Sequence, residues 1–343
     1  MTFKYSFNYL ILLALFSASA LTAAQESESN KRKHEESFES ELERYGIQWH
    51  SPEGSKKQKL QISAARHIAT SHFDIGIAQD QHIRDHMEDR TLSDVEAGDS
   101  NGLFCVFDGH GGSKSVDHVY ENFQKTFEHA ENCLPLTFQK LDFSLMNHAE
   151  THRSGTTAVV AYVKGATATI ANTGDSRIVF LRGNQVIDST VDHKPDSEKE
   201  SSRIKDAGGF VHTADGDDPR VGGLSCSRAL GDWQIRNHPI GVGIIAAPDI
   251  KEWALQKNDM LVLASDGIWD VMKNDEVAQG VDSFLIKHGS IDAPALEKTA
   301  QWLLAQAIEK GSQDNLTAML VRIKKIDKEE PSSQESLPKT QPL

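Results

Sequence analysis

Acidic residues recur at the ends of predicted strands in this 343-residue sequence. Asp108 directly follows the apolar run 103–107 in LFCVFDGHGG, and Asp266 follows the run 260–265 in LVLASDGIWD. Carboxylates that are brought together repel one another, so a cluster of them persists only where cations neutralise it. Because hard oxygen ligands without a set of cysteines or histidines select Mg²⁺ or Mn²⁺, the pattern predicts a divalent metal site.

Four further carboxylates lie at other predicted strand boundaries. Glu88 and Asp89 follow the first strand in RDHMEDR, Asp175 precedes a strand in ANTGDSRIVF, and Asp314 precedes the last strand in GSQDNLTAMLVRI. Each of these is by itself more typical of a turn, a helix cap or a solvated corner. Their repeated placement favours one shared site, because side chains at strand boundaries can converge at one edge of a sheet.

The chemistry that such a site predicts is hydrolysis of a phosphate ester. Two divalent ions roughly 3.5 to 4 Å apart, bridged by a carboxylate and a water, activate that water for attack on phosphorus. Asp108 is the best candidate for the bridge, and the glycines that follow Asp108 and Asp266 let a backbone carbonyl oxygen approach an ion. Arg84 offers the planar pair of donors that suits a phosphate dianion, and His110 is a candidate proton donor to the leaving oxygen.

Other site chemistries and partners fit the sequence less well. His82 and His86 have the spacing of a zinc pair but lack the general-base glutamate between them, and GHGG lacks the ending of a nucleotide-binding loop. The formal net charge is −14, so we expect no nucleic-acid partner. Three cysteines are too few for a disulfide framework, and Cys105 and Cys226 are expected to be small core residues.

The elements that must position these residues indicate an α+β body between residues 72 and 325. Strand patterns cover 73–78, 103–107, 156–163, 166–171, 177–181, 260–264 and 317–323, and helical patterns cover 113–130, 135–151, 196–207, 275–287 and 293–310. Lys164-Gly165 and Gly183-Asn184 predict two successive tight hairpins. Strands that arrive as hairpins, with helices grouped separately, favour antiparallel sheets.

The two ends of the chain differ from this body. Residues 1–24 combine Lys4, an apolar run and small residues, which predicts a signal peptide cleaved near Ala24 and an exported protein with no stable membrane insertion after cleavage. The alternative is an uncleaved anchor. Residues 25–71 are polar and are expected to form a flexible lead, and residues 326–343, rich in Pro, Ser and Gln, a disordered tail.

Eight stretches of the sequence together resemble the PPM, or type 2C, family of metal-dependent protein serine/threonine phosphatases. In order they are RDHMED, VFDGHGG, SGTTAVVA, ANTGDSR, RIKDAGGFV, RVGGLSCSRALGD, ASDGIWDVM and SQDNLTAMLV. The resemblance implies a four-layer α-β-β-α sandwich, with two central antiparallel sheets flanked by helices. It also implies hydrolysis of phosphoserine and phosphothreonine in proteins. The sequence specifies neither the individual substrates nor the oligomeric state.

The same resemblance implies roles for individual residues. The ligands of two Mg²⁺ or Mn²⁺ ions would be Asp108 as the bridge, Gly109 through its carbonyl oxygen, and four further carboxylates, namely Glu88, Asp89, Asp266 and Asp314. Glu88 and Asp89 would act mainly through bound waters.

The resemblance further implies direct attack by the metal-bridging water, with Arg84 binding the phosphate and His110 acting as the general acid. Asp175 and Asp270, with Asp266 shared, would form a weaker third metal site.

Two alternative functions stay open. A regulatory or binding module could use the same fold without catalysis, although such modules typically lose the metal carboxylates that this sequence keeps. A two-metal nuclease or phosphodiesterase would share the chemistry, but the acidic balance and the lack of basic, aromatic grooves argue against it.

Overall fold

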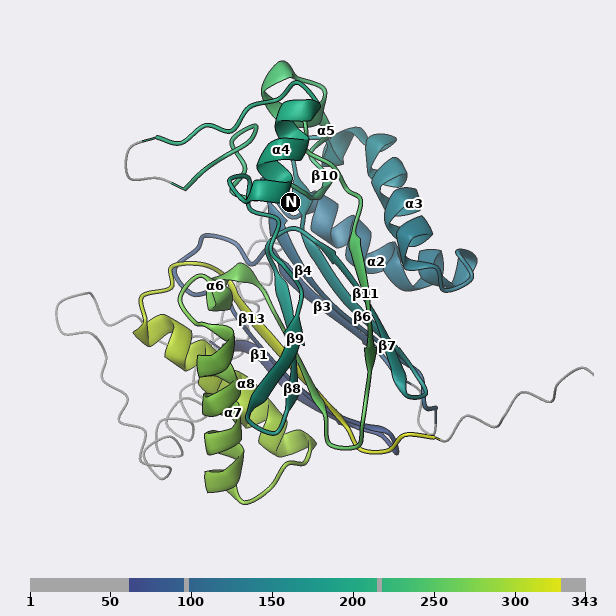
Figure 1. Ribbon diagram of the computed structural model, residues 1–343, viewed down its shortest axis with the longest axis vertical. Coiled ribbons are helices and arrows are strands. Elements are labelled where there is room, and N and C mark those ends of the chain that lie inside the picture. Colours follow the sequence, from purple (N-terminus) through teal and green to yellow (C-terminus); the bar gives the residue numbers. More distant parts are fainter. Residues whose placement is uncertain (1–61, 96–98, 215–217, 328–343) are drawn as a thin grey trace, which may run out of the picture. The chain divides into compact units, whose positions relative to one another are not determined.

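The computed structural model describes residues 62–95, 99–214 and 218–327, and two antiparallel sheets form the centre of this part of the chain (Figure 1). The first sheet has the strand order β1 (Ile62–Ala69), β2 (Phe73–Asp80), β13 (Leu316–Ile323), β12 (Met260–Ala264), β8 (Arg177–Arg182) and β9 (Gln185–Ser189). The second has the order β10 (Leu230–Gly231), β5 (Gly155–Thr156), β4 (Gly102–His110), β6 (Ala158–Lys164), β7 (Thr167–Thr173) and β11 (Asp249–Ala254), and β3 (Asp89–Asp94) also pairs with β4.

The core between the sheets comes from alternate residues of the strands, because successive side chains point to opposite faces. Phe73 of β2 and Phe104 of β4 belong to this cluster, and their rings meet edge to face with centroids 5.3 Å apart. The intervening residues of β4, among them Cys105 and Phe107, belong to a second buried cluster on the other face of the sheet. Burial on both faces explains why the run 103–107 is apolar without alternation.

Helices cover the outer face of each sheet. On the second sheet, α2 (Lys114–His129) and α3 (Leu134–Met146) add Val116, Phe123 and Phe138 to the cluster that contains Phe107. On the first sheet lie α7 (Asn274–His288) and α8 (Ala293–Glu309) (Figure 1). The α8 backbone approaches β2 so closely that a Cβ on Gly76 would overlap the backbone of the helix. The predicted four-layer α-β-β-α sandwich is confirmed.

The folded domain begins earlier in the chain than predicted. The lead was expected to run to residue 71, but Ile62–Ala69 forms β1 and pairs with β2 in the first sheet. This strand lies at the sheet edge and most of its described side chains are exposed or half-buried, so its sequence lacks the apolar alternation that would identify it. The predicted signal peptide, the remainder of the lead and the tail beyond residue 327 lie outside the described residues.

The other predicted elements agree with the structure to within a few residues, but two of them are divided, and β3, β10 and β11 were not predicted. The strand expected over 156–163 consists of β5 and β6. The helix expected over 135–151 ends at Met146 and is followed by a short 3₁₀ helix, η1 (Ala149–Thr151). The segment between β9 and β11 includes α4 (Glu198–Asp206), and its apolar residues Ile204, Val221 and Ile244 form a small cluster of their own. No helix within the described ranges combines the length and the apolar character needed to cross a bilayer.

Candidate active site

One cavity of about 290 Å³ collects most of the predicted site residues. Eight of the ten line it: Arg84, Glu88, Asp108, Gly109, His110, Asp175, Asp266 and Asp314. Of the other two, Asp89 is buried next to Asp108 in the sheet, and Asp270 lies further out with its side chain 54% exposed. Residues up to 230 positions apart in the sequence therefore meet in one place.

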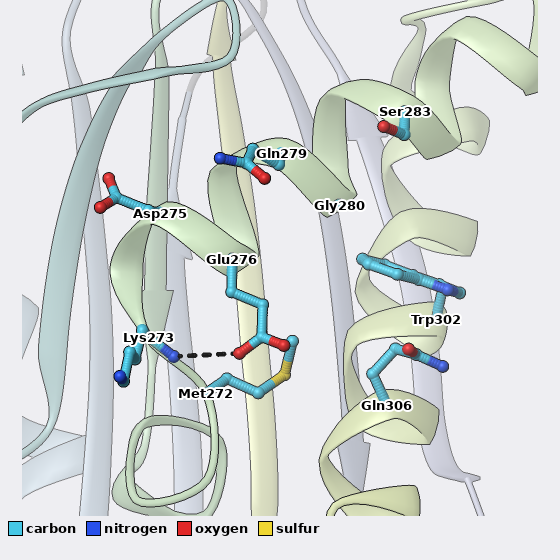
Figure 2. A pocket seen from close by; sticks show the side chains of 9 residues that line it. All are labelled: Met272, Lys273, Asp275, Glu276, Gln279, Gly280, Ser283, Trp302 and Gln306. Carbon is cyan, nitrogen blue, oxygen red and sulfur yellow. Dashed lines mark hydrogen bonds between the residues drawn. The ribbon is translucent and has the colours of Figure 1, made fainter.

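A larger pocket of about 630 Å³ lies between α7 and α8, and Figure 2 shows its lining. None of the predicted site residues lines it. One of its two acidic residues, Glu276, already forms an ion pair with Lys310 at 2.6 Å and accepts a hydrogen bond from the backbone of Lys273. We therefore place the candidate site in the smaller cavity on its chemistry and not on its size.

Strand pairing brings the first two carboxylates together. Asp89 opens β3 and Asp108 lies near the end of β4, and the two residues are direct partners in the register of these antiparallel strands. Directly opposed residues in an antiparallel pair have neighbouring side chains on one face. The carbonyl oxygen of Asp108 accepts a hydrogen bond from the backbone N–H of Thr157, which fixes β4 from the other side.

The remaining carboxylates come from three adjacent strands of the first sheet. Asp266 follows β12 as the first residue of the short helix α6 (Asp266–Trp269), and Asp314 precedes β13. Asp175 precedes β8, which pairs with β12 on its other edge. Pairing of β13, β12 and β8 therefore brings these three side chains to the same end of the sheet.

Asn315 holds the loop that carries Arg84. Its amide oxygen accepts a hydrogen bond from the backbone N–H of Glu88 at 2.8 Å, and its amide nitrogen donates to the carbonyl oxygens of Gln81 and His86 at 3.0 Å each. Sequence reasoning gave Asn315 no role, although it lies within the stretch SQDNLTAMLV.

His110 contacts a residue that was not among the predicted site residues. Its Nε2 lies 2.8 Å from Oδ2 of Asp232, whose side chain is 1% exposed. Burial alone would lower the pKa of His110, but the charge of Asp232 and this hydrogen bond outweigh burial and raise it. The signal that could have identified Asp232 is its position at the end of the stretch SCSRALGD. The same stretch begins with Ser225 and Cys226, which line the cavity.

A family model described as protein phosphatase 2C matches residues 73–316, which include every residue of this site and all strands of the two sheets except β1 and most of β13. The chain belongs to the protein phosphatase 2C family. It is 37% identical over 267 residues to "Probable protein phosphatase 2C 59" of Oryza sativa subsp. japonica, covering 74% of this chain and 77% of that protein. A protein of the same name from Arabidopsis thaliana is 37% identical over 263 residues, covering 73% and 79%.

A solved structure shares the fold. The serine-threonine phosphatase 2C from Toxoplasma gondii superposes with a TM-score of 0.63 at 23% identity, covering 76% of this chain and 99% of that one. The chain is thus a protein serine/threonine phosphatase of a metal-dependent family, and the resemblance found in the sequence is confirmed.

Three carboxylates of this phosphatase, Asp89, Asp108 and Asp266, fit divalent cations. Burial raises the pKa of Asp108 well above its ordinary value, and the charges of Asp266 and Asp89 raise it further. Burial likewise raises the pKa of Asp89 to about 6 and the pKa of Asp266 well above its usual range. Within the described part of the chain, Oδ1 of Asp89 and Oδ1 of Asp266 are buried without a hydrogen-bond partner. Buried, mutually repelling oxygen donors are the set that a hard divalent ion stabilises.

Two other carboxylates, Asp314 and Asp175, are instead paired with cationic side chains of the phosphatase itself. Arg84 Nη2 lies 2.5 Å from Asp314 Oδ2, and Lys194 Nζ lies 2.6 Å from Asp175 Oδ2. In the described residues, no three Asp, Glu, His or Cys side chains, including Asp89, Asp108 and Asp266, are already arranged as a group that could hold an ion.

The third metal site implied by the resemblance contains a cation of the chain itself. Lys194 Nζ also lies 3.6 Å from Asp270 Oδ1, so the ammonium group stands between the two carboxylates assigned to a third ion. Burial alone would lower the pKa of Lys194, but Asp175 and Asp270 raise it, so the group stays charged. As they stand, these residues do not fit a third cation.

Proposed function

We propose that the chain hydrolyses phosphoserine and phosphothreonine residues of proteins by direct attack of water, without a covalent enzyme intermediate. Two Mg²⁺ or Mn²⁺ ions would be held by Glu88, Asp89, Asp108, Asp266, Asp314 and the carbonyl oxygen of Gly109. When bound, the ions polarise the phosphoryl oxygens and lower the pKa of water. The observation that carries the proposal is that Arg84, Asp108 and His110 line the same cavity.

In this proposal Arg84 binds the phosphate. Its side chain is 53% exposed at the cavity, and its planar guanidinium pairs with Asp314 through one nitrogen while Nε donates to the carbonyl oxygen of Gln313. A phosphate dianion offers the same bidentate geometry as a carboxylate. Arg84 thus orients the phosphoryl group, and His110 gives a proton to the departing seryl or threonyl oxygen.

A metal titration with three classes of substrate tests this function. The purified chain is incubated with phosphoserine and phosphothreonine peptides, with a phosphotyrosine peptide and with bis(p-nitrophenyl) phosphate. We expect release of phosphate from the first two peptides that rises with Mn²⁺ or Mg²⁺ and stops on chelation. Cleavage of the diester while all peptides stay intact would favour a phosphodiesterase. Activity on none of the substrates would favour a binding module.

Replacing Lys194 with methionine is expected to add a metal ion to the phosphatase. With the ammonium group removed, Asp175 and Asp270 become a site for a cation, so isothermal titration with Mn²⁺ should change from two ions per chain to three. The matched control is Lys199→Met, since Lys199 pairs with Asp249 and does not line the cavity. Three ions in the unmodified chain, or two in both, would contradict this expectation.

We further propose that the chain is exported through residues 1–24, on the signal-peptide pattern of that segment. N-terminal sequencing of the protein from its native cell is expected to give a mature end near residue 25. An intact Met1 on cytosolic protein would exclude export.

A further inference from the structure

We propose that Asp232 is a positioning residue for the general acid His110, a role that rests on the proposed function. It holds the imidazole ring through Nε2 and leaves Nδ1 to donate the proton. In the reaction, the water oxygen bonds to phosphorus and loses a proton to solvent. The phosphorus bond to the seryl or threonyl oxygen breaks, and that oxygen keeps the electron pair and takes the Nδ1 proton. Solvent then reprotonates His110.

The contact between the two residues is made on the buried side of the ring. Oδ2 of Asp232 lies 2.8 Å from Nε2 of His110, and the side chains are 1% and 26% exposed. His110 also lines the cavity, and its Nδ1 has no hydrogen-bond partner within the described residues. One ring nitrogen is therefore fixed by the protein, and the other remains for a substrate.

Three paired strands bring His110 and Asp232 together on either side of Gly155. In the ladder β4–β5–β10, His110 and Gly231 both lie opposite Gly155, and Asp232 follows Gly231 directly. A Cβ on Gly155 would collide with Oδ2 of Asp232 and with Nε2 of His110. The missing side chain at this position is what leaves room for the hydrogen bond.

The backbone of Asp232 is held in an unfavourable conformation. Its φ of 54° and ψ of 29° are left-handed, a region that residues other than glycine seldom occupy. Neighbouring contacts maintain it: Asp232 N–H donates to the carbonyl oxygen of Ser154, and Asp142 accepts from Gly231 N–H and from Arg236. Strain that the surroundings maintain in this way is typical of functional positions.

Two other roles for Asp232 have to be separated from positioning. Its Oδ1 is buried without a partner in the described part of the chain, so the carboxylate could instead bind a metal ion. Its fully buried side chain could also serve the fold alone. The test therefore needs a measurement for each of these roles.

The test compares two substrates with different leaving groups in Asp232→Asn. Asparagine keeps the size of the side chain and tolerates a left-handed backbone. For a phosphothreonine peptide, whose alkoxide must be protonated, we expect kcat to fall about 10- to 100-fold with KM changed less than about twofold. For p-nitrophenyl phosphate, whose leaving group is stable as an anion, kcat should change less than about threefold. Mn²⁺ affinity, measured by isothermal titration, should stay unchanged.

Two further variants complete the design. Gly155→Ala is expected to give the same selective loss, because its Cβ occupies the space of the hydrogen bond. Asp259→Asn is the matched control: Asp259 is also buried, pairs with Arg182 and does not line the cavity, so it should lower thermal stability without changing the ratio of the two activities.

Several outcomes would overturn the assignment. Equal losses on both substrates would mean a structural role, weaker Mn²⁺ binding would mean a metal ligand, and full peptide activity in Asp232→Asn would mean that His110 works without it. Failure of the unmodified chain to hydrolyse either substrate would contradict the proposed function itself, and the positioning role with it.

Discussion

Replacing Asp108 with asparagine is expected to abolish phosphatase activity and to make the metal-free protein more resistant to heat. Asp108 is among the residues that would hold the proposed ions, so its loss would remove several kcal/mol of transition-state stabilisation. At about 1.4 kcal/mol per tenfold, kcat/KM should fall about a thousandfold or more.

The gain in stability has an electrostatic cause. Burial and the charges of Asp266 and Asp89 already raise the pKa of Asp108 well above its ordinary value, so the ionised group destabilises the metal-free fold. A neutral amide removes that repulsion, and a gain of about 1 kcal/mol would raise the unfolding midpoint by about 2 to 4 °C. Calorimetry in chelator, alongside the phosphopeptide assay, checks both effects.

Asp74→Asn serves as the control for Asp108→Asn. Asp74 is also buried, but it is paired with Arg322 and Lys324 and does not line the cavity. This variant should lose stability and keep its activity, the reverse of the result expected for Asp108→Asn. An Asp108→Asn protein that retains a tenth of the activity, or that unfolds at a lower temperature in chelator, would contradict the expectation.

Saturating Mn²⁺ is expected to raise the unfolding midpoint more at pH 7.5 than at pH 5. The pKa of Asp89 is raised from 3.8 to about 6, chiefly by burial, and burial also raises the pKa values of Asp108 and Asp266. A carboxyl group whose folded pKa is raised stabilises the fold fully below the unfolded pKa, and this contribution is lost as pH rises through the folded pKa. For Asp89 that loss falls between about pH 4 and pH 6.

Metal binding reverses this loss because the ions require the ionised carboxylates. At pH 5 protons compete for the site, so the gain from Mn²⁺ should be smaller by on the order of 2 kcal/mol, or about 4 to 8 °C. His193 has the opposite pH dependence, since burial lowers its pKa to about 4, but it acts equally with and without the ion and cancels in the difference.

The Asp108→Asn protein should show little gain from Mn²⁺ at either pH, because the site would then lack one of its proposed ligands. An equal gain at both values of pH in the unmodified protein, or a larger one at pH 5, would mean that the ions do not bind these carboxylates. Calorimetric scans at matched ionic strength provide the measurement.

Much of the fold could be predicted because burial leaves a pattern in the sequence. The runs 103–107 and 260–264 are apolar because both faces of β4 and β12 are buried, and their strand boundaries were found to within a few residues. β1 was missed for the opposite reason. It is an edge strand with mostly exposed or half-buried side chains, so hydrogen bonding to β2 creates it with little apolar signal.

The roles of Lys194, a cation, and Asp232, an acid, could not be predicted in the same way. Lys194 and Asp232 are 19 and 122 residues from their partners Asp175 and His110, and no local pattern links them. Charged residues in loops are most often solvated, so their types alone assign no role. Only their contacts show that Lys194 neutralises one carboxylate and that Asp232 fixes the ring of His110.

The sequence by itself determined the sandwich of sheets and helices, the carboxylates at strand ends and the residues Arg84 and His110, because these follow from local periodicity and from motifs in order. The tertiary structure decided which carboxylates are neighbours and which are already paired. Asp89 meets Asp108 through strand register, whereas Lys194 reaches Asp175 and Asp270 from a separate loop. Electrostatic interactions depend on distance and burial, and both are fixed only when the chain has folded.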